Sequence, residues 1–172
     1  PTEYPDDDYD DDVDRRINTV HEIGSGPPEL LRRCRLDRQA QLARTLRQWA
    51  DPGPSDVADA RLILARANLG ALVEGTMQLL LSVWLHDFRR EFDREKEPPE
   101  LMLHSVQTFF SQNVWTDAER AVWDPWVTEV RKRRNAVHAF CDRDLGEHAD
   151  FLADVRRYLH FMKAINSRLP YP

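Results

Sequence analysis

Cysteine and glycine are scarce in this chain of 172 residues, which contains two Cys and six Gly. The two cysteines, Cys34 and Cys141, lie far apart without a CxxC spacing, so neither a disulfide framework nor a zinc site is expected. The six His show no HExxH or similar spacing, and we predict no metal site. With so few glycines among many leucines, the composition favours helices over sheets.

Long hydrophobic runs are also missing from the sequence. The longest apolar patch, residues 79–85, is interrupted by Ser82 and falls well short of the ~20 residues that a membrane span needs. No signal peptide is visible at the start of the printed sequence. With 31% charged and 41% hydrophobic residues, the chain is expected to be one soluble globular domain in the cytoplasm, without a membrane partner.

The acidic net charge of −6 is unevenly distributed along the chain. Of the 30 acids, eight lie in residues 1–14, which contain no Lys or Arg, so the remaining chain carries 22 acids against 24 basic residues. Residues 1–14 are too polar and too strongly charged to fold alone. We interpret them either as a solvated tail or as an arm that masks a basic surface or binds a partner. A slightly basic body removes the objection that overall charge raises against nucleic-acid binding.

Hydrophobic periodicity predicts an all-α fold, an antiparallel bundle of four to five helices over residues 27–172, preceded by an acidic tail and connector over 1–26. The expected helices cover residues 29–49, residues from a Ser55 or Asp56 N-cap through Phe88, residues 100–113, residues from Pro125 towards His138, and residues 147–168. Thr116 and Glu119 have the spacing of a capping box, and Asp124 resembles an N-cap followed by proline at the first helical position. On the last helix, the apolar residues are expected to share one side that faces the core; they are Phe151, Leu152, Val155, Leu159, Met162 and Ile165.

The strongest chemical signal is a basic run that ends in a histidine. It consists of Arg131, Lys132, Arg133, Arg134 and Asn135, followed at a short distance by His138. Imidazole is the natural proton-transfer group near neutral pH, and arginine offers planar, bidentate donors matched to phosphate oxygens. The combination suits metal-independent RNA cleavage, in which His138 moves a proton at the ribose 2′-hydroxyl or at the leaving oxygen. One His serves both transfers poorly, so two motifs facing each other in a dimer are expected.

Glu74 is a carboxylate inside the apolar run of the second expected helix. Such a group is rarely left unpaired when buried. Two readings remain open from the sequence: Glu74 points to solvent, or it pairs with an Arg or His of a neighbouring helix.

At residues 133–138 the sequence resembles the HEPN domains (higher eukaryotes and prokaryotes nucleotide-binding), whose helical bundles carry an R-x4-6-H motif late in the chain. Here the motif is R-x4-H, and the stretch RRNAVHAF, followed by Asp142 and Arg143, is similar to prokaryotic members. The resemblance covers about residues 56–168. It implies an HEPN-like bundle and a metal-independent endoribonuclease without cofactors, acting as a toxin or antiviral (abortive-infection) effector. It also implies a homodimer whose two motifs form one cleft.

Carried over by position, the resemblance makes Arg133 and His138 the catalytic pair. A small polar residue commonly follows the arginine in the family, whereas here Arg134 follows it and Asn135 comes one place later. This leaves open whether Arg133 or Arg134 holds the phosphate. Arg134 and Asn135 are therefore expected to support the site. The resemblance also places Glu74 where many members carry a polar residue facing the motif, so Glu74 is expected to support it too. Arg131 and Lys132 are expected to bind RNA.

Two other functions remain open. The chain is alternatively a non-catalytic HEPN-like module that binds nucleotides or a partner such as a nucleotidyltransferase. In a third reading, the chain is a structural interaction domain whose acidic tail binds a partner. Under the ribonuclease reading, the same tail covers the basic surface of residues 131–134 or binds a basic antitoxin.

Overall fold

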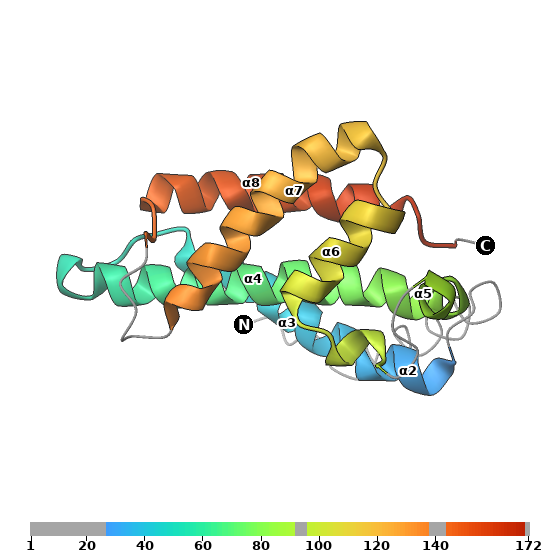
Figure 1. The fold of residues 1–172 in the computed structure, drawn as a ribbon. Helices are drawn as coiled ribbons and strands as arrows, with labels where there is room; N and C mark the ends of the chain where they lie inside the picture. Colours follow the sequence, from blue (N-terminus) through green and yellow to red (C-terminus); the bar gives the residue numbers. More distant parts are fainter. Residues whose placement is uncertain (1–26, 92–95, 138–143, 171–172) are drawn as a thin grey trace.

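A computed structural model describes residues 27–91, 96–137 and 144–170, and within α5 the side chains of residues 87, 90 and 91 are not described. These residues form an all-α bundle (Figure 1). Its α-helices are α2 (Pro28–Arg33), α3 (Leu36–Thr45), α4 (Ala58–Val83), α5 (Leu85–Glu91), α6 (Leu103–Asn113), α7 (Asp117–Arg134) and α8 (His148–Asn166). Short 3₁₀ turns are η1 (Leu46–Trp49), η2 (Ser55–Val57), η3 (Pro98–Glu100) and η4 (Asn135–Val137). Among the described helices, none has the length and apolarity to cross a membrane.

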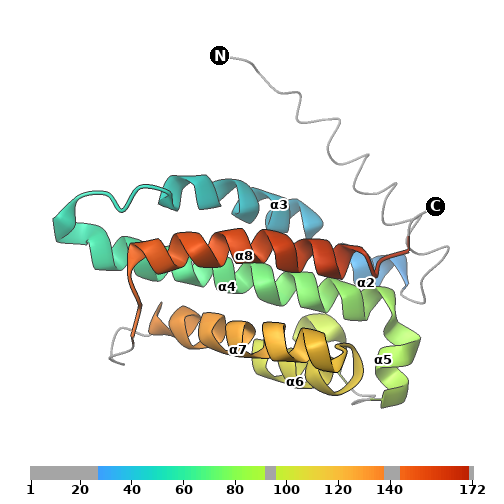
Figure 2. The same ribbon diagram turned by 90° about the horizontal axis from the view of Figure 1, so that it is seen from above.

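The centre of the bundle is α4, which packs against α2, α3, α6, α7 and α8. Figure 2 shows α8 lying over α4, with α3 on one side and α6 and α7 on the other. The buried side of α4 includes Leu69, Leu72, Val73 and Met77, each at most 1% exposed. Burial of side chains of this size contributes roughly 1.5–3 kcal/mol each, so α4 supplies much of the core.

The neighbouring helices α3 and α4, and likewise α6 and α7, run antiparallel, but α4 and α8 run parallel. Arg66 of α4 contacts Asp154 of α8, and Thr76 further along α4 is 2.9 Å from Tyr158 further along α8. By contrast, α7 and α8 are antiparallel. Trp126 of α7 contacts Asp154 early in α8, whereas Glu119, earlier in α7, contacts Arg168 just after the end of α8. The starts of α4 and α8 therefore lie at the same end of the bundle as the end of α7.

The single helix expected over residues 29–49 is wrong. The chain breaks between α2 and α3 at Arg35, whose φ of 49° lies in the left-handed region. Gln39 Nε2 donates to the Cys34 carbonyl at 2.7 Å and satisfies an acceptor that the break frees. The break separates α2, which buries Leu30 and Leu31, from α3, which buries no residue fully.

The N-cap predicted at Asp124 is also wrong, because α7 runs unbroken from Asp117 to Arg134 with Pro125 inside it. An internal proline removes one helical hydrogen bond and typically costs about 3 kcal/mol. Trp126, Val127 and Val130 follow it and are at most 3% exposed, so their burial offsets this cost. The capping box of Thr116 and Glu119 is confirmed and begins this long helix.

The other observed helix boundaries lie closer to those predicted from the sequence. No side chain of Ser55 or Asp56 caps α4; these residues form the 3₁₀ turn η2 and Val57 is the N-cap. The second expected helix is divided at Trp84, whose indole Nε1 donates to the Arg168 carbonyl at 3.1 Å. On α8, which is close to the expected range, Leu159 and Met162 are 49% and 40% exposed rather than in the core.

Candidate functional site

The basic run of the R-x4-H motif forms the last turn of α7, and Asn135 is its C-cap. Cations are favourable at a helix C-terminus because they interact with the partial negative charge of its free carbonyls. His138 lies outside the described residues, as do Cys141, Asp142, Arg143 and the acidic segment 1–14. The roles predicted for these residues therefore stay predictions.

Arg133 lies between two carboxylates. Its Nη1 is 3.1 Å from Asp154 Oδ2 on α8, and its Nε is 2.9 Å from Glu129 Oε1 one turn earlier on α7. The Arg133 side chain is 14% exposed. The guanidinium is thus held near the surface at the junction of α7 and α8, without being sealed in the core.

Asp154 is shared by three donors that come from two neighbouring helices. Its Oδ2 also forms an ion pair with Arg66 of α4, and its Oδ1 accepts a hydrogen bond from Trp126 Nε1 at 3.0 Å. The Arg66 side chain is only 1% exposed, and its guanidinium carbon lies 5.5 Å from the centre of the Phe151 ring. Burial lowers the pKa of Arg66, and the hydrogen bond and charge of Asp154 oppose this shift. Asp154 is therefore the counterion that makes burial of Arg66 tolerable.

Gly146 provides the backbone surface next to the Arg133 guanidinium. A Cβ at this position would lie 3.0 Å from both Cζ and Nη2 of Arg133 and 2.9 Å from Asp150 Oδ2. The residue also has φ of +62°, which side chains rarely adopt. Asp144 Oδ1 accepts from the Gly146 N–H at 2.8 Å and fixes the turn before α8. A side chain at position 146 would therefore be strained by the backbone conformation and would displace the Arg133 guanidinium or the Asp150 carboxylate.

Glu74 pairs with Arg134, so of the two readings left open by the sequence the structure shows the ion pair. Arg134 Nη1 is 2.8 Å from Glu74 Oε2, and their side chains are 31% and 15% exposed. The aliphatic stem of Arg134 lies on α4 at Gly70, where a Cβ would come within 2.6–2.8 Å of it. Arg134 is therefore anchored along α4, away from the Asp154 contacts of Arg133.

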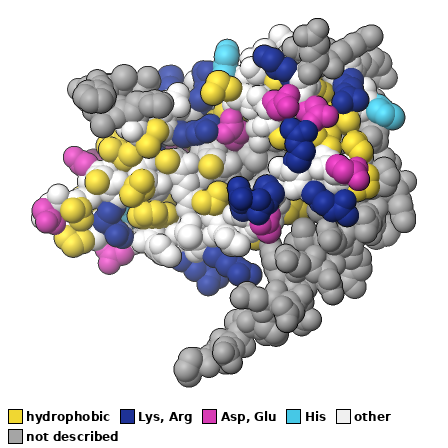
Figure 3. All heavy atoms as spheres, turned by 90° about the horizontal axis from the view of Figure 1, so that it is seen from below, with side chains coloured by type: hydrophobic (Ala, Val, Ile, Leu, Met, Phe, Trp, Pro, Cys, Tyr) yellow, Lys and Arg dark blue, Asp and Glu magenta, His cyan; other side chains and the backbone are white. Residues whose placement is uncertain are grey.

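The remaining predicted site residues, Arg131, Lys132 and Asn135, differ in how far they are exposed. Lys132 is 64% exposed and its Nζ lies 3.8 Å from Glu129 Oε2, while Arg131 and Asn135 are half-buried. The Asn135 backbone N–H donates into the last turn of α7. Seen from below, Lys and Arg side chains alternate with acidic ones, and hydrophobic side chains gather towards the end where α4 begins (Figure 3).

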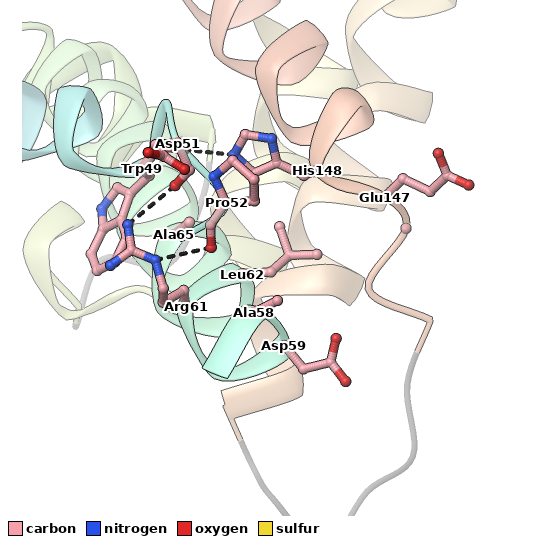
Figure 4. A pocket seen from close by; sticks show the side chains of 11 residues that line it. Trp49, Asp51, Pro52, Ala58, Asp59, Arg61, Leu62, Ala65, Glu147 and His148 are labelled. Carbon is pink, nitrogen blue, oxygen red and sulfur yellow. Dashed lines mark hydrogen bonds between the residues drawn. The ribbon is translucent and has the colours of Figure 1, made fainter. Parts of the chain in front are cut away.

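A cavity of about 320 Å³ adjoins the Arg133 region through Gly146, which lines it. Its other walls come from the loop after η1, the start of α4 and the start of α8 (Figure 4). His148 Nε2 is hydrogen-bonded to the Trp49 carbonyl at 2.8 Å, and the Arg61 guanidinium is bound by the Gln48, Asp51 and Pro52 carbonyls. Leu62 and Ala65 form an apolar wall, and Asp59 and Glu147 add carboxylates.

Reasoning from the sequence missed Arg66, Trp126 as a donor, Asp154 and this cavity. One signal was present: Arg66 falls between Leu62 and Leu69 at the spacing of the buried face of α4, so a buried guanidinium and an acid to pair with it were predictable. The choice of Asp154 over the nearby Asp150 was not, because it depends on how α8 is rotated against α4.

No family model, no curated protein and no solved structure matches this chain.

Proposed function

We propose that this protein is an HEPN-like, metal-independent endoribonuclease that acts as a toxin or antiviral effector. The observation that carries the proposal is the placement of Arg133. It lies in the last turn of α7, five residues before His138, and its guanidinium is bound to a carboxylate that already has a second arginine. When Arg133 turns to a phosphate, Asp154 keeps Arg66 as its partner, so the exchange leaves no unpaired carboxylate at Asp154.

In the proposed reaction, His138 takes the proton of a ribose 2′-hydroxyl while Arg133 holds the neighbouring phosphate and stabilises its added negative charge. The 2′-oxygen forms a bond to phosphorus, and the bond from phosphorus to the 5′-oxygen breaks. The leaving 5′-oxygen takes a proton, and a 2′,3′-cyclic phosphate remains. A second His138 from a homodimer partner is the proposed proton donor, and the enzyme is proposed to act in the cytoplasm.

The test is cleavage of a mixed RNA pool in EDTA by wild type, His138→Ala and His160→Ala. His160 lies exposed on α8 and serves as the matched histidine control. We expect wild type and His160→Ala to cut, leaving 2′,3′-cyclic phosphate or 3′-phosphate ends, and His138→Ala to lose activity by about 10²-fold or more. Equal cutting by wild type and His138→Ala would contradict the proposal.

The cavity beside Gly146 favours a second candidate function, a non-catalytic module that binds a nucleotide or a protein partner such as an antitoxin or a nucleotidyltransferase. Its apolar wall and polar rim are typical features of ligand sites. Under this function the folded protein cuts no RNA, and titration with nucleotides or a partner gives saturable binding that Ala58→Phe, which fills the cavity, abolishes.

A further inference from the structure

One carboxylate serves two guanidiniums at the junction of α4, α7 and α8. Asp154 Oδ2 binds both Arg66 and Arg133, although Asp154 supplies a single negative charge. Glu129, which is 38% exposed, gives Arg133 a second partner. The cluster of Arg66, Arg133, Asp154 and Glu129 therefore has no net charge, but its two arginines compete for the same oxygen.

The two arginines are held with different strength. The Arg66 side chain is 1% exposed, so separation from Asp154 would leave a buried positive charge without its counterion, which is strongly unfavourable. Arg133 is 14% exposed at the surface end of the cluster. If Arg133 turns away, Asp154 keeps Arg66 and the Trp126 Nε1–H, so its own charge stays compensated. Arg133 is thus the arginine that exchanges partners.

Within residues 27–91, 96–137 and 144–170, the ion pair of Arg134 with Glu74 is not shared with a further charged side chain, so Arg134 does not have this freedom. Glu74 is 15% exposed and has Arg134 as its partner at 2.8 Å, and the stem of Arg134 is fitted against Gly70. Loss of that pair leaves a half-buried carboxylate without its counterion. The difference between shared and unshared carboxylates assigns Arg133 the mobile role.

We propose that Asp154 is a positioning residue for Arg133: it aims the guanidinium in the resting protein and competes with an RNA phosphate for it. This rests on the proposed ribonuclease function. Asp154 does not touch RNA in this scheme. Arg66 and Trp126 hold Asp154 in place after Arg133 has moved to the phosphate.

The test uses the double variant Arg66→Met/Asp154→Asn, which leaves the net charge unchanged and puts no uncompensated arginine in the core. Because Asp154 no longer competes for Arg133, which keeps only Glu129 of its two carboxylate partners, affinity for a 2′-O-methyl RNA that cannot be cut should rise about threefold to tenfold. Because the guanidinium is no longer aimed, kcat on cleavable RNA should fall about tenfold to a hundredfold. A merely structural role would not move these two quantities in opposite directions.

The same double change in an Arg133→Gln background is the matched control, and it should alter neither the affinity nor the residual rate. An equal loss of affinity in both backgrounds, or no change in either, would overturn the inference. A conservative Asp154→Glu variant should keep kcat within a few-fold of wild type, since it retains the charge.

A readout independent of cleavage separates this inference from the proposed function. In NMR spectra of the wild type, the Arg133 Nε–H resonance, assigned by its loss in Arg133→Gln, should shift on addition of inorganic pyrophosphate. In the double variant it should shift at a lower pyrophosphate concentration. If the resonance responds this way but no RNA is cut, the ribonuclease proposal fails and the positioning role stands. If pyrophosphate shifts it in neither protein, the inference fails whatever the cleavage result.

Discussion

Replacement of Asp154 by Ala should lower the free energy of unfolding by about 3–5 kcal/mol, the range for removal of one partner from a buried ion pair. The loss arises chiefly at Arg66, whose 1% exposed guanidinium keeps its charge but loses its carboxylate. Trp126 Nε1 loses its acceptor at the same time. Equilibrium unfolding in urea, followed by far-UV circular dichroism, measures the change.

Two controls show that burial, and not the loss of any ion pair, causes this effect. Asp37→Ala removes the exposed pair with Arg35 and should cost only about 0–1 kcal/mol. The double variant Arg66→Met/Asp154→Leu removes both charges and should recover most of the stability, because an apolar pair of similar size replaces the buried ions. A loss below about 1 kcal/mol for Asp154→Ala would contradict the counterion role.

The exchange of arginine for glutamine at positions 133 and 134 should decide which arginine holds the phosphate. We expect Arg133→Gln to reduce kcat by about 10²–10³-fold, the usual effect of removing one donor to a developing oxyanion. Arg134→Gln should reduce kcat by less than about tenfold, since it removes a structural pair with Glu74 and not a donor to the substrate.

Single-turnover cleavage with saturating enzyme measures this difference without interference from product release. Lys163→Gln, which changes an exposed lysine near the end of α8, is the matched control for loss of one positive charge and should leave kcat nearly unchanged. A larger loss for Arg134→Gln than for Arg133→Gln would reverse the assignment and would remove the basis for the role of Asp154.

The all-helical architecture was predictable because it depends on periodicity, which is local. Leu69, Leu72, Val73 and Met77 mark the buried side of α4 in the sequence as they do in the structure. Helix boundaries were less predictable where tertiary packing outweighs a local signal. Pro125 reads as a helix start, yet the buried residues that follow it keep α7 continuous.

At the candidate site, Arg133, Arg134 and Glu74 could be named from the sequence, but the carboxylate that Arg66 and Arg133 share could not. Glu74 stood out because it interrupts an apolar run, and pairing with an Arg or His of a neighbouring helix was one of the two readings left open; the structure shows the partner to be Arg134. Asp154 did not stand out, because α8 carries other acids and its rotation about its axis selects the one that faces Arg66 and Arg133. The spacing of Arg66 marks it on the buried face of α4, but the acid that meets it depends on the packing of three helices and cannot be read from any one of them.

The central position of α4 has a consequence for how the protein opens. A helix covered by α2, α3, α6, α7 and α8 cannot expose its middle turns while the rest of the fold persists. Amide protons around Leu69 to Val73 should therefore exchange with solvent deuterium only through global unfolding, whereas those of α3, which buries no residue fully, exchange through local fraying. The slowest-exchanging amides of α4 then report the stability of the whole fold in the absence of denaturant.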